Sequence, residues 1–435
     1  MGHIVNPERE YRLLQQQLDR KIQGAPDSPA LMKILSLLYS PEEANIARLI
    51  PNRPTSLNVL SRKLNIPAHD LDDRMTEMAR RGVVLDIEHK GRRYFMLPPV
   101  IIGLFEFTFM RARPDMPMAE LSRLFEEYFT ESDRFARTLF QGKTQMFRSF
   151  VREEAIPEHE HTEILDWERA SHIVTSALSI GVGLCQCHHM ATHLGKACDR
   201  PQVVCLSFNH GAQTMVRNGY ARAITTAEAM KVLETCKEAG LAQTGDNVRQ
   251  RVTFICNCCG CCCHLMQGMK TFNLHHGVVT SNWIMEVDLA SCKGCGKCVA
   301  ACPVDAIEII EKVEGGKKRK FAVRDGSICL GCGVCYSACK FGGAKMKPRP
   351  KRVLTPETAF DQLVSMAVER GKLSSLIFDD PQKLSHRALA RIITVLEKSP
   401  PFKAAMAIAP LKSTFLNMMV KGAKKKNKKM KDLIS

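Results

Sequence analysis

Long apolar runs are missing from this chain of 435 residues. The two best candidates for a membrane span, Ile173–Leu184 and Ala404–Val420, are too short or are broken by Pro410 and Lys412, whereas a spanning helix needs about 20 apolar residues. The first ten residues are polar and no cleavable apolar region follows them, which argues against a secretory signal. We therefore expect a cytoplasmic protein without a transmembrane segment.

Nucleotide-binding loops are also missing. The segments GVGLC at 181–185 and CGKC at 295–298 place glycine near cysteine, but neither has the spacing of a dinucleotide-binding or phosphate-binding loop. This absence argues against a redox activity that relies on a nicotinamide or flavin bound by the chain itself.

Acidic residues are scarce in the last part of the chain. The formal net charge is +17, and residues 341–435 hold 20 Lys/Arg against 7 Asp/Glu. The segment KGAKKKNKKMK at 421–431 is rich in lysine and has no aromatic residue. Two interpretations remain open for this tail: a solvated terminus, or a peripheral contact with nucleic acid or an anionic membrane surface.

Cysteine, in contrast, is abundant, with 19 residues. In a chain without a secretory signal, this number indicates a reducing compartment rather than a set of disulfides. Eight of the cysteines repeat one spacing, C-x-x-C-x-x-C-x-x-x-C, and they are Cys292, Cys295, Cys298, Cys302, Cys329, Cys332, Cys335 and Cys339. Three cysteines so spaced on a tight loop can turn toward one cubic cluster, while the fourth starts a helix that reaches a different cluster.

Glycines recur with the cysteines. Gly294 and Gly296 in the first loop match Gly331 and Gly333 in the second. Glycine permits a left-handed backbone and lets peptide N–H groups approach inorganic sulfides. At the segments CKGCGKCVAACPVDAI and CLGCGVCYSACKFGGA the chain closely resembles bacterial-type two-cluster [4Fe–4S] ferredoxins.

This resemblance covers residues 286–348 and implies a βαβ-like module with two [4Fe–4S] clusters. It implies that one cluster is held by Cys292, Cys295, Cys298 and Cys339, and the other by Cys329, Cys332, Cys335 and Cys302. Zinc is the alternative, because C-x-x-C pairs also build zinc sites, but the doubled spacing favours iron–sulfur. Two features depart from the family: Lys340 replaces the usual proline, and the longer segment 311–326 predicts a hairpin around Gly315–Gly316.

Ten further cysteines crowd the region before this module. They are Cys185, Cys187, Cys198, Cys205, Cys256, Cys258, Cys259, Cys261, Cys262 and Cys263. Four thiols suffice for one tetrahedral zinc ion or one more cluster, but vicinal cysteines leave the backbone in different directions and cannot all serve one cubane. We expect at least one further centre, a third iron–sulfur cluster or zinc, with ligands from both segments, and the remaining thiols free for a second metal or for redox chemistry.

Nearby residues favour structural interpretations. Cys236 lies inside an expected helix between apolar neighbours and is interpreted as a core thiol. His188, His189 and His193 lack the glutamate of a zinc-protease motif, so contacts to thiolates or surface positions are favoured over metal ligation. The segment Glu158–His161 is interpreted as a surface loop rather than a metal site.

The amino-terminal part resembles a winged helix-turn-helix. Apolar periodicity predicts helices at 31–39, 41–50, 56–64 and 68–81, followed by a two-stranded hairpin at 83–97.

DNA binding by this domain is disfavoured. The expected recognition helix opens with Asp70, Asp72 and Asp73, whose charge has the wrong sign to face phosphates. Residues 1–100 carry 15 basic against 12 acidic groups, which is no basic footprint. A packing or partner-docking role is favoured, although four arginines remain available for a phosphate backbone: Arg80, Arg81, Arg92 and Arg93.

Together these patterns predict a multidomain α+β protein. We expect an N-terminal helical extension (1–29), a winged-helix-like domain (30–98), a helical connector (99–165), a Cys-rich α/β domain (166–285), the dicluster ferredoxin module (286–348), a helical C-terminal region (349–420) and the Lys-rich tail (421–435). Residues 167–184, at the start of the Cys-rich domain, are expected to form a helix.

Electron transfer is the function that this organisation predicts, as a relay or subunit in anaerobic redox metabolism. Lys293, Lys297, Lys340 and the basic run 317–320 favour a redox partner protein with an acidic docking surface. One alternative is an oxidoreductase, an iron–sulfur reductase with its substrate site at Cys256–Cys263. The other is a redox-sensing regulator that reads DNA through the winged helix.

Overall fold

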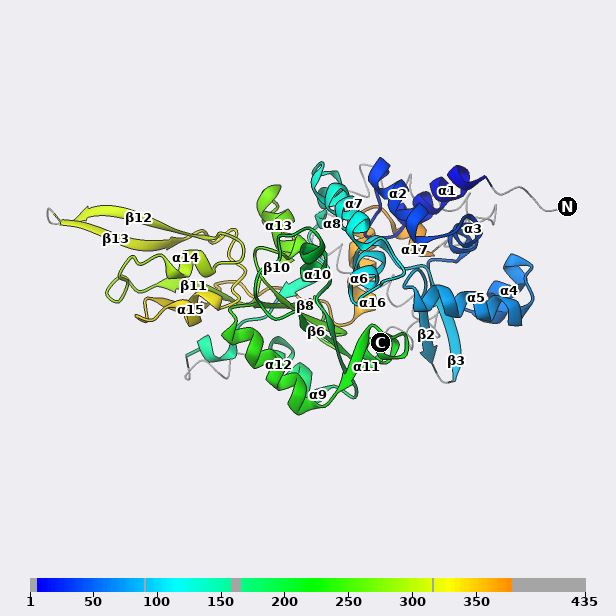
Figure 1. Ribbon diagram of the computed structural model, residues 1–435. Coiled ribbons are helices and arrows are strands. Elements are labelled where there is room, and N and C mark those ends of the chain that lie inside the picture. Colours follow the sequence, from blue (N-terminus) through cyan, green and yellow to red (C-terminus); the bar gives the residue numbers. More distant parts are fainter. Residues whose placement is uncertain (1–5, 90, 158–165, 315–316, 378–435) are drawn as a thin grey trace, which may run out of the picture. The chain divides into compact units, whose positions relative to one another are not determined.

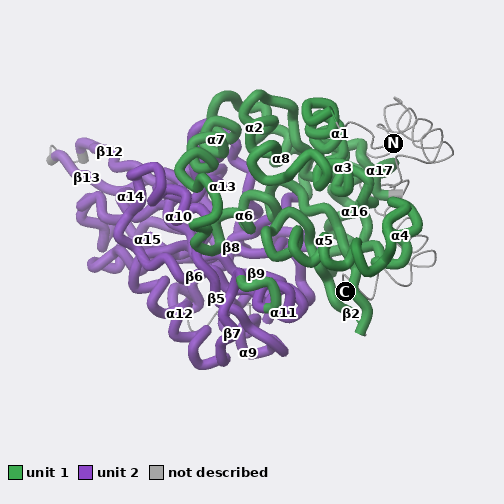
Figure 2. Tube along the Cα trace, turned by 45° about the vertical axis from the view of Figure 1, so that its right-hand side comes forward, with its two compact units in different colours: residues 1–144, 217–219, 358–435 green, residues 145–216, 220–357 purple. Residues whose placement is uncertain are grey.

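The computed structural model describes residues 6–89, 91–157, 166–314 and 317–377 (Figure 1). The chain is a mixed α+β protein with two compact units (Figure 2). The first unit comprises residues 1–144, 217–219 and 358–435, and the second comprises residues 145–216 and 220–357. Within the described ranges, no helix combines the length and the apolar character that a bilayer crossing requires.

The first unit is mainly helical. Its first five helices are α1 (Pro7–Asp19), α2 (Pro29–Leu38), α3 (Pro41–Leu49), α4 (Leu57–Leu64) and α5 (Ala68–Arg80). A small antiparallel sheet has the strand order β1-β3-β2, with strands β1 (Thr55–Ser56), β2 (Leu85–His89) and β3 (Arg92–Met96). The remaining elements are η1 (Val100–Leu104), α6 (Phe105–Phe109), α7 (Met118–Thr130), α8 (Arg134–Phe140), α16 (Ala359–Glu369) and α17 (Leu373–Ile377).

The helices and hairpin expected between residues 31 and 97 are present. Local capping explains two of the starts: Ser28 and Ser40 accept hydrogen bonds from backbone N–H groups three residues on, and proline occupies the first helical position in both cases. Leu71, Met75 and Met78 of α5 are buried, so the helical periodicity in the sequence identified the packed face.

Ion pairs engage three of the four arginines that were candidates for a phosphate backbone. Arg81 pairs with Glu43, and Arg80 lies 3.6 Å from Glu77. Arg93 contacts Asp72 at 2.6 Å and Asp86 at 3.0 Å. The guanidinium of Arg93 therefore ties the hairpin to α5, and this internal pairing counts against DNA recognition by these side chains.

The second unit is built on a seven-stranded sheet of order β10-β4-β8-β9-β6-β5-β7. Its strands are β4 (Phe147–Ser149), β5 (Ile180–Leu184), β6 (Val203–Phe208), β7 (Ala221–Ile224), β8 (Ala242–Asp246), β9 (Phe254–Cys258) and β10 (Val278–Val279). Its helices are η2 (Glu153–Ala155), η4 (Asp166–Glu168), α9 (Ala170–Ser176), α10 (Gln186–His193), α11 (Asn209–Arg217), α12 (Thr226–Glu238) and α13 (His264–Thr271). All strand pairs are antiparallel except β10–β4.

Two strands lie where the sequence suggested helices. Residues 147–149 form β4, inside the stretch expected to be a helical connector, and residues 180–184 form β5, inside the helix expected at 167–184. The helix α9 ends at Ser176, and Ile180 and Val182 alternate with glycines in β5. Gly181 lies against the Ser207 side chain of β6, with only 2.8 Å from the position of a Cβ to Ser207 Oγ, so tertiary packing selects the strand.

The ferredoxin module forms the end of the second unit. Strand β11 (Trp283–Val287) pairs with β14 (Ala344–Pro348), and β12 (Ile307–Glu314) pairs with β13 (Lys317–Arg324). The short helices α14 (Lys297–Ala301) and α15 (Val334–Ala338) each follow one cysteine loop, and Figure 1 shows them beside the long β12–β13 hairpin. The antiparallel hairpin predicted between the two motifs is present.

Three predicted segments lie outside the described residues, wholly or in part. They are the helical C-terminal region beyond residue 377, the Lys-rich tail and the Glu158–His161 segment.

Candidate metal centres

Two cavities in the ferredoxin module are each lined by four cysteines. Cys292, Cys295, Cys298 and Cys339, here called the outer set, line one cavity. Cys302, Cys329, Cys332 and Cys335, here called the inner set, line the other. Each set takes three cysteines from one motif and the fourth from the other. This arrangement fits a [4Fe–4S] cluster in each cavity, because every thiolate binds a different iron of the cubane.

The backbone of the two cysteine loops contributes left-handed glycines and N–H donors to these cavities. Gly294, Gly296, Gly331 and Gly333 all have positive φ angles, between +61° and +80°. Backbone N–H groups donate to thiol sulfurs in both sets: Ala322 to Cys292 Sγ at 3.5 Å, and Ala306 to Cys302 Sγ at 3.2 Å. Donors of this kind stabilise the negative charge of thiolates and tune the potential of a bound cluster.

The outer and inner sets differ in exposure. Cys295 of the outer set is exposed, whereas Cys329, Cys332 and Cys335 of the inner set are buried. Burial raises the pKa of the Cys332 thiol to about 12. The outer set reaches the surface through Cys295, although its Cys298 is buried, and the inner set has three buried members and the half-buried Cys302.

Arg152 connects the inner set to the large sheet, and sequence analysis missed it. Its backbone N–H donates to the carbonyl of Cys332 at 3.1 Å. Its guanidinium donates to Ser337 Oγ at 2.6 Å and to the carbonyls of Lys237 and Leu241 at 2.9 and 3.2 Å. An isolated arginine after a strand carries no motif, so only the fold reveals this role.

The ten cysteines of the Cys-rich domain separate into two groups. The first, here called the six-thiol group, comprises Cys185, Cys187, Cys205, Cys256, Cys258 and Cys263. The second, here called the tetrad, comprises Cys198, Cys259, Cys261 and Cys262. Two of the three vicinal pairs divide between the groups: Cys258 and Cys263 join the first, and Cys259 and Cys262 join the second, whereas Cys261 and Cys262 stay together in the tetrad.

The six-thiol group lies where strands β5, β6 and β9 meet the first turns of α10 and α13. Five of its members interact pairwise through their thiols, in the order Cys205, Cys256, Cys258, Cys263, Cys187. Cys185 is close enough to Cys205 and Cys263 for their charges to interact.

Helix starts supply N–H donors to the six-thiol group. Cys185 and Cys263 are the N-cap residues of α10 and α13. The backbone N–H of His188 donates to Cys185, and those of Leu265 and Met266 donate to Cys263. Hydrogen bonds from the Cys187 and Cys258 thiols hold the pKa of Cys263 well below its ordinary value. Helix N-termini favour negative charge, so this group is suited to thiolates bound to a metal centre.

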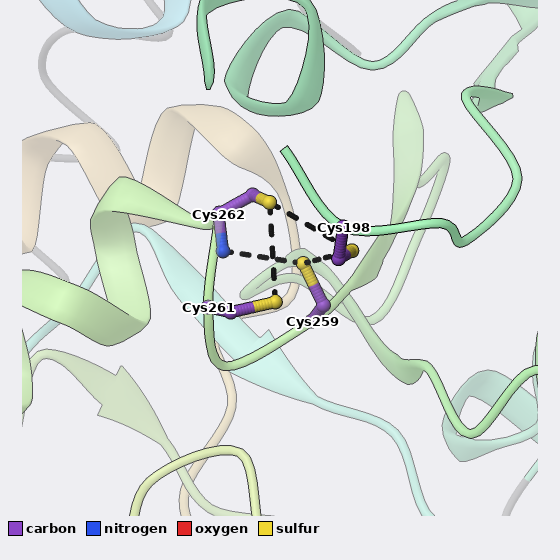
Figure 3. Close-up of side chains that lie close together, drawn as sticks. All are labelled: Cys198, Cys259, Cys261 and Cys262. Carbon is purple, nitrogen blue, oxygen red and sulfur yellow. Dashed lines mark hydrogen bonds between the residues drawn. The ribbon is translucent and has the colours of Figure 1, made fainter. Parts of the chain in front are cut away.

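The tetrad is much more compact (Figure 3). Its four sulfur atoms all lie within 4.8 Å of one another. Cys198 Sγ is 3.9 Å from Cys259 Sγ and 3.8 Å from Cys262 Sγ, and Cys261 Sγ is 3.9 Å from Cys262 Sγ. Cys198 comes from the segment between α10 and β6, and the other three share the turn between β9 and α13.

The turn that carries the tetrad also touches the ferredoxin module. A Cβ placed on Gly260 would lie 2.5 Å from the carbonyl oxygen of Pro303, so the two backbones are in direct contact. Pro303 follows Cys302 of the inner set. Lys270 Nζ donates to the Gly260 carbonyl at 2.9 Å and lies 3.4 Å from Asp305, which holds the two segments together.

The other candidate residues take the structural roles favoured by the sequence. Cys236 is fully buried, and burial raises its pKa to about 12. His188 Nε2 lies 2.6 Å from the carbonyl oxygen of Cys198 and 3.9 Å from its sulfur, so it orients this cysteine. His189 and His193 contact each other at 3.2 Å between their Nε2 atoms.

Comparison with known proteins gives one match. Residues 291–343 match a family described as a 4Fe-4S dicluster domain. No curated protein and no solved structure matches the chain significantly. The matched segment and the cysteine sets around the two cavities support an iron–sulfur protein. The match covers much less than half of the chain, so the other domains rest on their own residues.

Proposed function

We propose that this chain is an electron-transfer protein that holds one [4Fe–4S] cluster in the outer set and another in the inner set. The observation that carries this proposal is the pair of cavities, each lined by four cysteines drawn from both motifs. Such clusters accept and release one electron each. The chain contributes the thiolates, the N–H donors to sulfur, and a burial that differs between the two sets.

The exposed outer set is the side that a redox partner approaches. Lys293 and Lys297, next to Cys292 and Cys298, are both exposed. Their positive charges stabilise the reduced state of a cluster held there and attract an acidic surface. A redox protein with an acidic docking face is therefore the proposed partner, in the setting of anaerobic metabolism.

The buried inner set leads toward the Cys-rich domain. Pro303, which follows Cys302, lies directly against Gly260. Gly260 is in the turn between Cys258 and Cys263, and both of these cysteines belong to the six-thiol group. We propose that four of these six thiols hold a third iron–sulfur cluster, which makes the ferredoxin module a relay between the partner and this centre. The N–H donors from α10 and α13 support this assignment, because they can offset the charge of a thiolate-bound cluster.

Iron and sulfide analysis of the anaerobically purified full chain tests both parts. Three clusters predict twelve irons and twelve sulfides per chain, and the Cys256→Ser and Cys263→Ser variants should bring both counts to about eight. Eight irons in the unsubstituted chain would contradict the third cluster and would still agree with two clusters in the ferredoxin module. Fewer than eight, with zinc in the ferredoxin module, would overturn the relay as well.

Gly260→Ala tests the contact between the two domains. The added methyl group would collide with the Pro303 backbone, so we expect slower electron exchange between the ferredoxin clusters and the third centre with unchanged iron and sulfide contents. Gly195→Ala is the matched control, because Gly195 also lies in the Cys-rich domain but has no neighbour within 4 Å of the Cβ position. Equal exchange rates in the two variants would contradict a path through this contact.

A further inference from the structure

The tetrad belongs to none of the proposed iron–sulfur sites. It lies outside the ferredoxin module, and along the turn after β9 three of its cysteines lie between Cys258 and Cys263 of the six-thiol group. In the described parts of the chain, no other three Cys, His, Asp or Glu side chains bring their ligand atoms within 4.8 Å of one another. The tetrad therefore differs in kind from the outer set, the inner set and the six-thiol group.

The distances between the tetrad sulfurs match the ligands of one metal ion. Four sulfurs placed tetrahedrally at about 2.3 Å from a zinc ion are about 3.8 Å apart. Three of the six separations in the tetrad are 3.8, 3.9 and 3.9 Å, and the other three are at most 4.8 Å. A disulfide is excluded because its sulfurs are only about 2.05 Å apart. A cubane is disfavoured because its four thiolates bind four separate irons and must lie farther apart, as they do around the two ferredoxin cavities.

The local backbone is also that of a metal-binding turn. Cys259 and Cys262 have the C-x-x-C spacing that is common in zinc sites, and the backbone N–H of Cys262 donates to Cys259 Sγ at 3.3 Å. This contact places two sulfurs on one side of the turn and stabilises a thiolate at Cys259. Cys198, more than fifty residues earlier in the chain, completes the set opposite them.

The surroundings of the tetrad suit the net negative charge of four thiolates around a divalent ion. Arg200 Nη1 lies 3.8 Å from Cys261 Sγ and is held by a hydrogen bond from its Nε to the Ala239 carbonyl at 3.1 Å. His188 orients Cys198 from the opposite side. On its inner face, Cys259 and Cys262 pack with Ala191, Val204, Cys236 and Leu241 in one apolar cluster, which excludes water from that side.

We propose that the tetrad is a structural zinc site, Zn(Cys)4, with ligands Cys198, Cys259, Cys261 and Cys262. Four protein ligands fill the tetrahedral coordination and leave no position for substrate or water. Zinc has no redox chemistry of its own, so the site acts as a cross-link: it ties the Cys198 segment to the turn that holds Gly260 against Pro303. This inference does not depend on the proposed electron transfer.

Two exposed cysteines make a matched test. Cys261 belongs to the tetrad and Cys295 to the outer set, and both are exposed, so serine at either position should leave the fold in place. In the anaerobically purified full chain we expect one zinc per chain. Cys261→Ser should lose this zinc and keep its iron and sulfide, whereas Cys295→Ser should keep the zinc and lose iron. Cys236→Ala, which removes a neighbouring thiol that is not a ligand, should keep both metals.

Zinc-edge X-ray absorption of the unsubstituted protein provides a readout that does not depend on any variant. We expect four sulfur ligands at about 2.3 Å and no nearby iron. Absence of zinc, zinc with nitrogen or oxygen ligands, or a single iron in the tetrad would overturn this inference. Zinc retained in Cys261→Ser and lost in Cys295→Ser would also overturn it, because the metal would then lie in the outer set. Fewer than eight irons per chain together with one full zinc would contradict the proposed electron transfer but would agree with the zinc site.

Discussion

The ferredoxin sets and the tetrad arrange the same side chain differently. In the outer and inner sets, four thiols line a cavity, whereas in the tetrad the four sulfurs lie within 4.8 Å of one another. The difference lies in the backbone. In the ferredoxin loops, glycines with positive φ turn the chain around a space, while the Cys259–Cys262 turn closes on itself through an N–H···S contact. The proposals of clusters in the ferredoxin sets and of a single ion in the tetrad follow from this difference in the arrangement of the sulfurs.

Single cysteine-to-serine substitutions should have the largest effect on the metal content. Cys302→Ser should lose the same cluster as Cys335→Ser, although the two residues lie in different motifs, because both line the inner cavity. Cys339→Ser and Cys298→Ser should likewise lose the same cluster, because both residues line the outer cavity. Each change should remove about four irons. EPR spectra of the four reduced variants should fall into these two pairs, and pairing by motif instead would contradict the crossed sets.

Two glycine substitutions distinguish the effect of backbone strain from that of a steric collision. Gly331→Ala would place a methyl group 2.1 Å from the carbonyl oxygen of Trp283, whereas Gly296→Ala meets nothing within 4 Å. Both residues have positive φ, so both variants carry a conformational cost of about 1–2 kcal/mol, and only Gly331→Ala adds a collision with backbone. We expect Gly331→Ala to lose the inner cluster and Gly296→Ala to keep both.

Iron content and the urea midpoint of the anaerobic proteins measure this difference. Similar losses in the two glycine variants would show that the left-handed conformation alone controls assembly. The close approach of Gly331 to Trp283 would then play no part.

The smallest effect is expected from charge at the outer set. Lys293→Gln should lower the reduction potential of the outer cluster, because a nearby positive charge favours the reduced form. Lys293→Glu should lower it about twice as far, with shifts on the order of tens of mV for an exposed side chain. Potentiometric titration followed by EPR measures both. An equal shift in the reduction potential of the inner cluster would contradict the account, because the inner cluster should be less affected by a charge at the outer set.

The ferredoxin module could be predicted almost completely from the sequence. A repeated local spacing fixes which residues share a loop, and the positions of Gly294 and Gly331 fix how each loop turns. The N-terminal helices could also be predicted, because capping serines and apolar periodicity are local sequence signals. Strand β5 could not be predicted in this way, because it is defined by its pairing with β6 and β7, and the close approach of Ser207 and Ala221 explains the glycine at 181.

The division of the ten other cysteines depends on contacts that the sequence does not reveal. Cys198 joins Cys259 across about sixty residues, and only the order of strands β9, β6 and β5 in the sheet brings their segments together. Cys258 and Cys259 belong to different groups because they lie at the end of strand β9, where the side chains of neighbouring residues point to opposite faces of the sheet. Arg152 and Arg200 likewise gain their roles from partners far away in the chain.

A metal and sulfide inventory of the native chain determines whether widely spaced thiols hold clusters and closely spaced thiols hold one ion. Iron and acid-labile sulfide should be equal in number, at eight or twelve per chain, with one zinc, because each [4Fe–4S] cluster contains as many sulfides as irons. An excess of one iron over sulfide, without zinc, would place a single iron in the tetrad. Iron below eight would contradict the claim for the ferredoxin sets themselves.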